Sequence, residues 1–374
     1  MRILIYQPYN QIVVYIESVA EQFVREGHQV FFVSHDERGE THKNFEEMGC
    51  LAEALPVVRS STLGYYFRRI VKLIQFCKEK QVDVVYSHFQ EANIISVFAQ
   101  FFCQANFVIN RHHTDCAFVD DNWREKWGDK IINRFAKIYI ATSPRVYRQI
   151  VELEKVNSAK VRLINYGYNF NNFKKVNPKK VDEIKKKFPS EILLVQAARY
   201  ISEKRHYELI NSVKQLVELG YDIKLLLLGK GPLEQEIDSQ IVISGLQKHV
   251  FNIGFQLNIM DYFAAADLVV HFSISEASNS AIKEAAWVGT SAAVCTGVGD
   301  FDEYIKHGIN GMLLNKENPG KDFIDCIKNV LEKKYSLSEM GRQLMIDVVS
   351  RFDIKNVIDH YKKLNKEITD EVSE

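Results

Sequence analysis

The sequence predicts two doubly wound α/β domains in series, and three observations lead to this prediction. Short β-rich runs alternate with amphipathic helical patterns along nearly the whole chain. A polar, lysine-rich stretch at Asn169–Phe188 interrupts the alternation, and a fresh strand pattern follows it. The chain has 374 residues, which is long for one hydrophobic core. A parallel sheet covered by helices is therefore expected on each side of the interruption.

The first half contains strand patterns separated by helical ones. One helix is expected at Val13–Glu26, ended by Gly27, and another at Pro144–Glu154, with Ser143 as its N-cap. The stretch at Asn169–Phe188 is interpreted as the inter-domain connection plus a solvated helix. The strands are expected at Arg2–Tyr6, Gln29–Val33, Val82–Tyr86, Asn106–Ile109, Ile138–Ala141 and Val161–Ile164.

The second half repeats the alternation. Helices are expected at Glu203–Leu219, stopped by Gly220, and at Pro232–Ser244. Strands are expected at Ile192–Ala197, Ile223–Leu228, Leu268–His271 and Ser291–Cys295. An apolar stripe at helical spacing predicts a last helix that packs back on the first domain; it consists of Ile354, Val357, Ile358, Tyr361 and Leu364. The predicted domains are 1–170 and 171–353, followed by a C-terminal helix at 354–374.

Composition and charge restrict the class of protein. The formal net charge is +0, so no global attraction for nucleic acid is expected. The six cysteines form no CxxC pair, which argues against a disulfide framework or a zinc site and for a reducing compartment. The apolar run at Met1–Tyr6 is too short for a signal peptide, and polar residues interrupt Ile94–Ile109. A cytoplasmic protein without a membrane span is therefore expected.

Polar residues that follow predicted strands are candidates for a ligand site, because ligands of open α/β sheets bind at the carboxyl ends of strands. Arg199 and Lys204 follow the strand at Ile192–Ala197, and Ser202 is the predicted cap of the next helix. Two cations beside a helix N-terminus suit a diphosphate, although most such pairs are solvated surface residues. The turn at Gly229–Pro232 either admits a ligand close to the backbone or is only a tight turn.

The segment Glu276–Glu284 is the strongest candidate. Ser278, Asn279 and Ser280 are expected to cap a short helix that Gly289 ends, with Glu284 about one turn inside it. Carboxylates at such a place accept hydrogen bonds from sugar and ribose hydroxyls, while the free amides face phosphate. From spacing alone, a loop acid and a surface helix residue explain the same pattern.

Taken together, these motifs resemble the donor-binding segment of retaining family 4 glycosyltransferases, over nearly the full chain and in the family's order. The E-x7-E pattern at Glu276–Glu284 is followed by Thr296–Gly299 and by the tail His307–Gly311. The remaining matches are Ala198-Arg199…Lys204 (the G-R…K pair), Leu228–Pro232 (the G-x-G-P turn), Val250–Phe255 (the base-binding strand), Tyr166–Asn169 (the hinge) and Gly27–Val30 (G-H-x-V).

The resemblance implies a GT-B fold, in which two Rossmann-like domains face each other across a cleft. It implies that Arg199 and Lys204 hold the diphosphate of a nucleotide sugar. Glu276, with the amides of Ser278, Asn279 and Ser280, is implied to bind the transferred sugar, and Glu284 the ribose. Further donor-binding positions are Gly229, Gly231, Phe255 and Thr296. His113 is preferred to His112 as the histidine near the reacting centre. No cofactor or metal is expected, and Asp300-Phe301-Asp302 is interpreted as incidental.

Several positions depart from the family pattern. Ala277-Ser278-Asn279 follows Glu276 where the family has G-F-G, and Trp287 and Ser291 replace an alanine and a proline. Asp300 stands where the second glycine of G-G-x-x-E is usual. Gln7–Gln11 replaces the glycine-rich loop after the first strand. These changes leave the identity of the sugar and of the acceptor open.

The implied reaction moves a hexose or N-acetylhexosamine from a nucleoside-diphosphate sugar, UDP in preference to GDP, with retention of configuration. The implied acceptor is a glycan or lipid-linked sugar in cell-surface polysaccharide or lipopolysaccharide synthesis. Two alternatives stay open: a sugar-nucleotide 2-epimerase, which needs no acceptor, and a degenerate glycosyltransferase that serves as a binding subunit. A nicotinamide dehydrogenase is disfavoured because the glycine fingerprint is lacking.

A basic amphipathic helix is the one sequence feature that bears on a membrane. Tyr66, Phe67, Ile70, Leu73 and Ile74 form its predicted apolar face, beside Arg68, Arg69 and Lys72. Such a helix rests on an anionic leaflet, at the inner face of the plasma membrane, or is an ordinary core helix with a solvated side.

Overall fold

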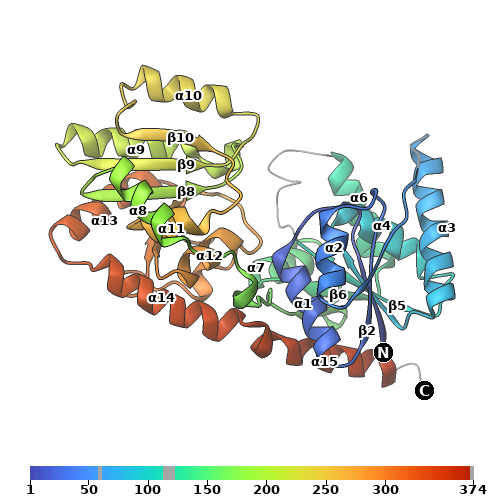
Figure 1. The fold of residues 1–374 in the computed structure, drawn as a ribbon. Helices are drawn as coiled ribbons and strands as arrows, with labels where there is room; N and C mark the ends of the chain where they lie inside the picture. The colour runs from blue at the N-terminus through green and yellow to red at the C-terminus, as the bar shows by residue number, and fades with distance from the viewer. Residues whose placement is uncertain (58–60, 113–122, 371–374) are drawn as a thin grey trace. The chain divides into compact units, whose positions relative to one another are not determined.

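A computed structural model describes residues 1–57, 61–112 and 123–370 of the chain. The chain folds into two compact units (Figure 1). Unit 1 is formed by Met1–Asn172 together with Phe352–Glu374, and unit 2 by Phe173–Arg351. Unit 1 is therefore built from both ends of the sequence.

Unit 1 contains a parallel seven-stranded sheet in the order β3-β2-β1-β4-β5-β6-β7. Its strands are β1 (Arg2–Tyr6), β2 (Gln29–Ser34), β3 (Leu51–Ala54), β4 (Val84–His88), β5 (Asn106–Arg111), β6 (Ile138–Ala141) and β7 (Val161–Leu163). Its helices are α1 (Val14–Arg25), α2 (Glu40–Glu47), α3 (Thr62–Lys80), α4 (Gln90–Ala99), α6 (Trp123–Phe135), α7 (Pro144–Arg148) and α15 (Ile354–Asp370).

Alternating side chains of the unit 1 strands form two cores, one on each face of the sheet. Ile3 and Ile5 of β1 pack with α1, α2 and α15, whereas Leu4 and Tyr6 pack with α3 and α4. Helix α15 closes the first core with the whole predicted apolar stripe and with Ile368. The predicted return of the last helix to the first domain is therefore confirmed.

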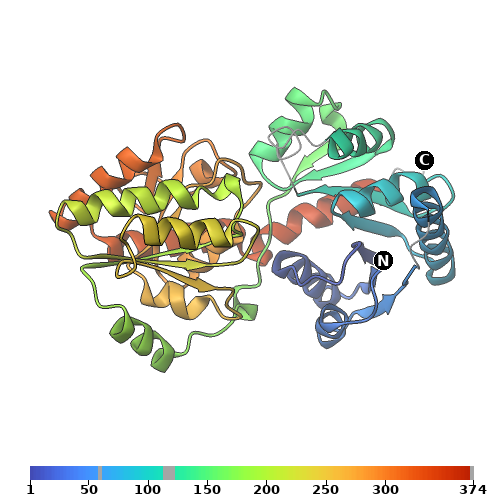
Figure 2. The same cartoon turned by 90° about the horizontal axis from the view of Figure 1, so that it is seen from above.

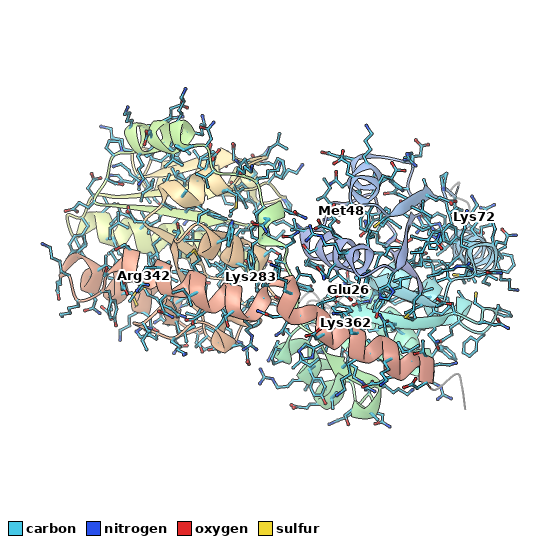
Figure 3. All side chains as sticks on the ribbon, turned by 60° about the horizontal axis from the view of Figure 1, so that its bottom comes forward. Glu26, Met48, Lys72, Lys283, Arg342 and Lys362 are labelled. Carbon is cyan, nitrogen blue, oxygen red and sulfur yellow. The ribbon has the colours of Figure 1, made fainter. Side chains whose placement is uncertain are left out.

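Polar contacts also fix α15 against the rest of unit 1. Tyr86 donates a buried hydrogen bond from its hydroxyl to Asn365 Oδ1, at 2.7 Å. Lys362 Nζ lies 2.7 Å from Glu26 Oε1, and Figure 3 shows the two residues side by side. The buried hydrogen bond fixes the register of α15, because slipping the helix would leave a polar atom unpaired in the core.

Unit 2 contains a parallel six-stranded sheet in the order β10-β9-β8-β11-β12-β13. Its strands are β8 (Ile192–Ala197), β9 (Ile223–Leu228), β10 (Val250–Gly254), β11 (Leu268–His271), β12 (Ser291–Cys295) and β13 (Met312–Leu314). Its helices are α8 (Pro178–Lys187), α9 (His206–Glu218), α10 (Glu234–Ile243), α11 (Met260–Ala265), α12 (Ser280–Trp287), α13 (Pro319–Leu331) and α14 (Leu337–Phe352).

The order of the unit 2 strands reverses at β8, which pairs with β9 on one side and with β11 on the other. Helices α9, α10 and α13 pack on one face of the sheet, and α8, α11 and α12 on the other (Figure 2). Because α/β sheets bind ligands where the strand order reverses, the carboxyl ends of β8 and β11 mark the expected ligand position.

Most predicted strands are confirmed, but several helix starts are wrong. Helix α9 begins at His206 rather than Glu203, because residues 202–204 form a 3-10 turn and Arg205 has a positive φ of 50°. Ser202 does not cap that helix. Pro232 lies in a turn, and α10 begins at Glu234. Helix α7 ends at Arg148 and continues as a π-helix over Gln149–Leu153. The prediction omitted β3 and β13.

The apolar face of α3 packs largely on the core of unit 1, in agreement with the interpretation as an ordinary core helix, whereas the predicted basic side is wrong at one residue. Leu73 is fully buried and Ile74 packs against the core of unit 1. Arg69 is buried and forms an ion pair with Glu91, with its guanidinium 4.0 Å from the centre of the Tyr65 ring. The basic side of α3 therefore excludes Arg69.

Candidate active site

Most of the predicted donor-binding residues follow five neighbouring strands of unit 2, at the carboxyl edge of the sheet. The loop after β8 carries Arg199 and Lys204, and the loop after β11 carries Glu276. Gly229 and Gly231 follow β9, Phe255 follows β10, and Thr296 follows β12. Since all these strands are parallel, their carboxyl ends share one edge, and the predicted residues come together there.

Lys204 and Glu276 form an ion pair across the point where the strand order reverses. Their side chains are only 15% and 12% exposed. Lys204 Nζ also lies 3.4 Å from Ser273 Oγ, and Gln196 Nε2 donates to the carbonyl of Lys204 at 3.0 Å. A cation and a carboxylate are thus fixed beside each other at the expected ligand position.

His271 connects Glu276 to the start of α12. Its Nε2 lies 2.7 Å from Glu276 Oε1 and 2.9 Å from Asn279 Nδ2. Burial by itself raises the pKa of Glu276, but the Lys204 ammonium and the hydrogen bond from His271 outweigh burial and hold the pKa well below its usual range. Glu276 is therefore ionised, and we assign the proton on His271 Nε2 as the one donated to it. Because Asn279 Nδ2 is also a donor, its approach to Nε2 is then a close contact and not a second hydrogen bond. The sequence prediction missed His271.

Asn279 is the N-cap of α12, since its Oδ1 accepts a hydrogen bond from the amide of Ile282 at 3.1 Å. The prediction placed the cap among Ser278, Asn279 and Ser280, and the structure assigns it to Asn279. Gly289 follows the end of the helix with a positive φ of 80°, as predicted. The amide end of α12 thus begins next to Glu276.

Glu284 lies on α12 and is partly buried. Its carboxylate makes no hydrogen bond or ion pair with any residue that the structure describes. Burial raises its pKa to about 7. A partly buried carboxylate with no partner among the described residues can accept hydrogen bonds from ligand hydroxyls.

The hydroxyl of Ser278 is engaged within the protein, whereas the predicted role of this residue concerns its backbone amide. Ser278 Oγ donates to Asp300 Oδ2 at 2.6 Å and accepts from Lys283 Nζ at 2.9 Å. Lys283 also lies 2.9 Å from Asp300 Oδ2, and the two side chains are 0% and 1% exposed. Lys283 Nζ further donates to the carbonyl of Asn279 at 3.2 Å. We call this buried group, which the sequence prediction missed, the Lys283 network.

The Lys283 network joins three segments: the loop after β11, helix α12 and the loop after β12. Burial lowers the pKa of Lys283, and Asp300 opposes that shift. Gly299, next to Asp300, approaches Glu276 so closely that a Cβ at 299 would lie 3.0 Å from Glu276 Cβ. The network therefore holds the loop after β12 against the Glu276 carboxylate.

Gly229 and Gly231 are required by the packing of the protein itself. A Cβ at Gly229 would lie 1.9 Å from the carbonyl oxygen of Ala198, and one at Gly231 would lie 2.5 Å from that of Tyr200. The turn after β9 therefore packs directly on the loop that carries Arg199. Beyond the turn, Phe255 is 61% exposed, and Lys230 Nζ lies 5.2 Å from the centre of its ring.

The other two predicted positions differ in their surroundings. Arg199 is exposed, and its guanidinium makes no hydrogen bond or ion pair within residues 1–57, 61–112 and 123–370. Thr296 donates to Asp302, which also accepts from the amide of Gly297 at 2.6 Å. Asp300 and Asp302 thus have separate partners. Groups of three or more metal-binding side chains are absent from the part of the chain that the structure describes.

In unit 1, His113 lies outside the described residues, but His112 is at the carboxyl end of β5. His112 Nε2 lies 2.9 Å from His88 Nδ1, and its Nδ1 lies 3.0 Å from the Tyr166 hydroxyl and 3.3 Å from that of Tyr15. Burial lowers the pKa of His88 to about 3. Because both ring nitrogens of His112 contact protein groups, the geometry favours a role in which His112 holds these neighbouring side chains in place over direct contact with a reacting atom.

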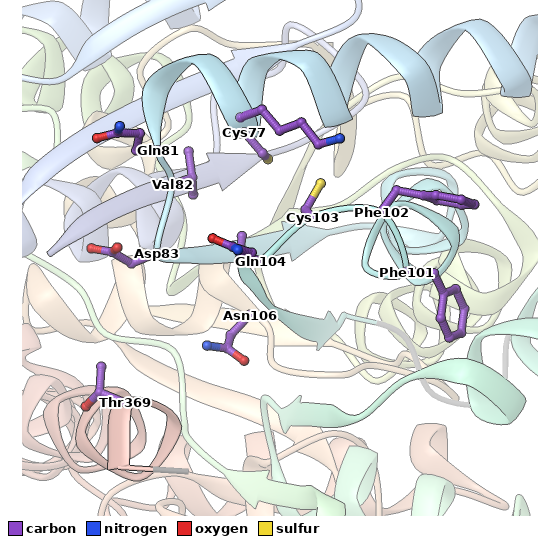
Figure 4. Close-up of a pocket in the computed structure, with 12 residues that line it drawn as sticks. Cys77, Gln81, Val82, Asp83, Phe101, Phe102, Cys103, Gln104, Asn106 and Thr369 are labelled. Carbon is purple, nitrogen blue, oxygen red and sulfur yellow. The ribbon is translucent and has the colours of Figure 1, made fainter. Parts of the chain in front are cut away.

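A cavity of about 1030 Å³ in unit 1 lies away from these groups (Figure 4). It is lined by residues before β4 and at the start of β5, including Val82, Asp83 and Asn106. These residues mark the amino edge of the sheet, whereas α/β sheets bind ligands at the carboxyl edge. We therefore do not assign the donor site to this cavity.

Among the described residues, no helix is long and apolar enough to cross a membrane.

Solved structures with the same fold cover nearly all of the chain. HepE of Anabaena, solved in complex with UDP-glucose, is 19% identical, covers 100% of this chain and 99% of its own, and has a TM-score of 0.81. Sucrose-phosphate synthase of Thermosynechococcus elongatus is 14% identical with a TM-score of 0.79, over 98% and 99% of the two chains. The fold is that of the GT-B glycosyltransferases.

Comparison of the sequence gives the same result. The family described as "Glycosyl transferases group 1" matches residues 178–344, and "Glycosyltransferase Family 4" matches residues 12–171. An uncharacterized glycosyltransferase of Methanocaldococcus jannaschii is 20% identical over 79% of this chain and 82% of its own. N-acetyl-alpha-D-glucosaminyl L-malate synthase of Bacillus anthracis is 24% identical over 61% and 58%. The chain belongs to the group 1, family 4 glycosyltransferases and is a transferase enzyme.

Proposed function

We propose that this enzyme transfers a hexose or N-acetylhexosamine, with retention of configuration, from a UDP-sugar to a glycan or lipid-linked sugar. The Lys204–Glu276 pair, where the strand order of unit 2 reverses, supports this proposal most directly. A nucleotide sugar carries both phosphates, which suit the cation, and hydroxyls, which suit the carboxylate. Arg199, which is exposed in the same loop as Lys204, supplies a second cation for the diphosphate.

Each group then has a task that its chemistry allows. Lys204 has three N–H donors, so it can bind a phosphate oxygen while it keeps Glu276 in place. The ionised Glu276 accepts hydrogen bonds from the hydroxyls of the transferred sugar, and Glu284 accepts them from the ribose. Arg199 and Lys204 stabilise the negative charge that develops on the departing diphosphate, which is the largest electrostatic demand of the reaction.

Related proteins support the donor and the kind of acceptor. HepE of Anabaena has been solved with UDP and with UDP-glucose. A Campylobacter jejuni relative, 22% identical over 64% of each chain, is an N-acetylgalactosaminyltransferase that acts on a diphospho-undecaprenol-linked sugar. We extend both properties to this chain, with action at the cytoplasmic face of the plasma membrane in polysaccharide or lipopolysaccharide synthesis. Contact with an anionic membrane belongs to the same proposal, because a lipid-linked acceptor stays in the bilayer.

The test is a transfer assay with purified enzyme, a panel of UDP- and GDP-sugars and lipid-linked acceptors, with the anomeric configuration of the product read by NMR. Arg199→Ala is expected to lower the rate by roughly two to three orders of magnitude, because a positioned charge is lost from the transition state. Lys214→Ala, an exposed lysine on α9, is the control and should leave the rate unchanged. An inverted product, or an unaltered rate for Arg199→Ala, contradicts the proposal.

Incubation of the enzyme with the donor alone separates the transferase from an epimerase. A transferase leaves the stereochemistry of the UDP-sugar unchanged when no acceptor is present. An epimerised nucleotide sugar in this reaction would overturn the proposed function, and donor binding without turnover on any acceptor would favour a degenerate subunit.

A further inference from the structure

An apolar groove in unit 1 lies between α3 and α6, over α4. It encloses about 550 Å³, and its lining includes Leu63, Phe67, Ile94, Phe98, Trp123 and Trp127. Leu63 is 86% exposed, Phe67 66%, Trp123 63% and Trp127 58%. We call this feature the α3–α6 groove. An exposed apolar surface that includes two tryptophans is unusual on a protein that has only three.

The exposed side chains of the groove lie outside the core that α3 also serves, although Tyr66 and Ile70 line the groove and pack against that core as well. Leu73, Phe76 and Cys77 of α3 are buried against β1, β2 and β4. Leu63 and Phe67 lie in the first turns of the same helix and do not belong to that core. Helix α3 thus presents one apolar surface to the sheet and a second one to the outside.

Cations surround the groove in excess of acids. Arg124 and Lys130 of α6 are exposed, with the Arg124 guanidinium 5.6 Å from the centre of the Trp123 ring and Lys130 Nζ 5.1 Å from that of Trp127. Helix α6 also carries Lys126 and Arg134, and across the groove Arg68 of α3 is exposed. Two of the acids have internal partners, since Asp129 pairs with buried Arg111 and Glu91 pairs with Arg69. The third acid, Glu125 of α6, is half-buried and lies between Arg124 and Lys126.

The groove lies near the edge of unit 1 where an acceptor is expected. Helices α3, α4 and α6 follow β3, β4 and β5, so their first turns lie at the carboxyl edge of the sheet. Leu63, Phe67, Trp123 and Trp127 belong to the first turns of α3 and α6. His112, at the end of β5, shares this edge.

We propose that the α3–α6 groove docks the protein on the surface of an anionic bilayer. Tryptophan side chains are favoured at the boundary between hydrocarbon and headgroups, and cations beside them meet lipid phosphates. Apolar lining and a basic rim together complement this surface better than they complement the polar surface of a soluble partner. The inference deepens the proposed function, since it specifies how the enzyme reaches a lipid-linked acceptor.

The experiment measures sedimentation of the full chain with phosphatidylcholine vesicles, with and without phosphatidylglycerol. The groove variant combines Phe67→Ser, Trp123→Ser and Trp127→Ser, and the charge variant combines Arg124→Gln, Lys126→Gln and Lys130→Gln. Basic residues near an anionic surface contribute roughly 1 kcal/mol each, so the charge variant is expected to bind about two orders of magnitude more weakly. The groove variant should lose binding at least tenfold.

Matched controls change the same chemistry elsewhere in the chain. Lys185→Gln, Lys186→Gln and Lys187→Gln remove three charges from α8, and Ile243→Ser removes an apolar side chain of α10 that is 85% exposed. Both controls should bind vesicles like the wild type. In a Trp287→Phe background the fluorescence reports only Trp123 and Trp127, and it should shift to shorter wavelength on anionic vesicles.

The proposal is overturned if the wild type does not sediment with anionic vesicles, or if the groove and charge variants bind these vesicles as tightly as the wild type does. A dimer in solution that the groove variant abolishes would instead assign the groove to a second copy of the chain, and would also overturn the proposal. UDP binding without vesicles is measured for every variant by calorimetry. If the wild type does not bind UDP, the proposed function is contradicted. The vesicle experiment still tests the groove in that case, because it does not depend on UDP binding.

Discussion

At the scale of single residues, Glu284 shows how burial tunes a group before any ligand arrives. Burial raises its pKa from 4.5 to about 7, so between these pH values the folded protein holds a proton that the unfolded chain has released. The free energy of unfolding therefore falls as pH rises through this window. Replacing Glu284 by Gln should remove this slope, so the stability of the variant relative to the wild type should increase from pH 5 to pH 7.5. Urea unfolding at several pH values measures it, and parallel curves would refute it.

The affinity for the donor should depend on the protonation of the same residue, Glu284. Hydrogen bonds from ribose hydroxyls favour the ionised form of Glu284, so donor binding releases a proton below about pH 7. A UDP-sugar is the suitable probe, because both of its phosphates are esterified and do not titrate in this range. We expect its affinity to rise from pH 6 to pH 8 in the wild type and to stay level in Glu284→Gln. Calorimetry in two buffers of different ionisation enthalpy checks the proton release.

Gly229 offers a test of the close approach between two loops. The Cβ of Gly229→Ala would lie 1.9 Å from a backbone oxygen of Ala198, so one loop must move. Gly245→Ala is the control, since Gly245 also has a positive φ, 69°, but a Cβ there meets nothing within 4 Å. We expect Gly229→Ala to be less stable than this control by about 1–3 kcal/mol, which is the usual cost of overpacking. Equal stabilities of the two variants would contradict this prediction and would mean that the loop after β8 moves aside at little cost in free energy.

At the scale of elements, α12 owes its position to the Lys283 network. Lys283→Met leaves the buried Asp300 carboxylate without its cation and should cost about 3–5 kcal/mol. Adding Asp300→Leu replaces the ion pair by apolar side chains and should restore most of that loss. Urea unfolding of the wild type, both single variants and the double variant measures the coupling. A double variant no more stable than Lys283→Met would mean that Ser278 and Asn279 depend on the charge itself.

The sequence predicts elements well where apolar patterning defines them. Strands such as Leu268–His271 are buried on both faces and read as continuous apolar runs. Helix α9 begins late because Arg205 takes a left-handed conformation that favours glycine, and no local signal marks it. Strand β3, with the sequence LAEA, has only four residues, two of which are alanines and one a glutamate, so its pattern is weak.

Prediction of the site has a similar limit. Arg199, Lys204, Glu276 and Glu284 could be found because motifs carry them. The pairing of Lys283 with Asp300 spans 17 residues and joins helix α12 to the loop after β12, so only the fold reveals it. The role of His271 was equally hidden, because a histidine that ends an apolar strand looks like a core residue.

At the scale of the whole molecule, α15 makes the two ends of the chain interdependent. Ile358 is 2% exposed within the core of unit 1, so Ile358→Asp buries a charge against α1 and the sheet. The cost should exceed about 4 kcal/mol, at the upper end for single substitutions. Lys363→Asp, on the exposed side of the same helix, is the control. Calorimetry should show a lower unfolding temperature for Ile358→Asp alone, and equal unfolding temperatures would contradict the packing of α15.

The division of unit 1 between both termini has a consequence for how the protein is made. A ribosome releases the strands of the first sheet early, but the helix that covers one of its faces leaves only after unit 2. During synthesis of the whole intervening unit, that face stays open to water and to other nascent chains. Unit 2 is contiguous in sequence and needs no later segment to complete its core. Maturation of unit 1 should therefore wait until α15 has been synthesised, and chaperones should meet this chain chiefly through its unsealed first sheet.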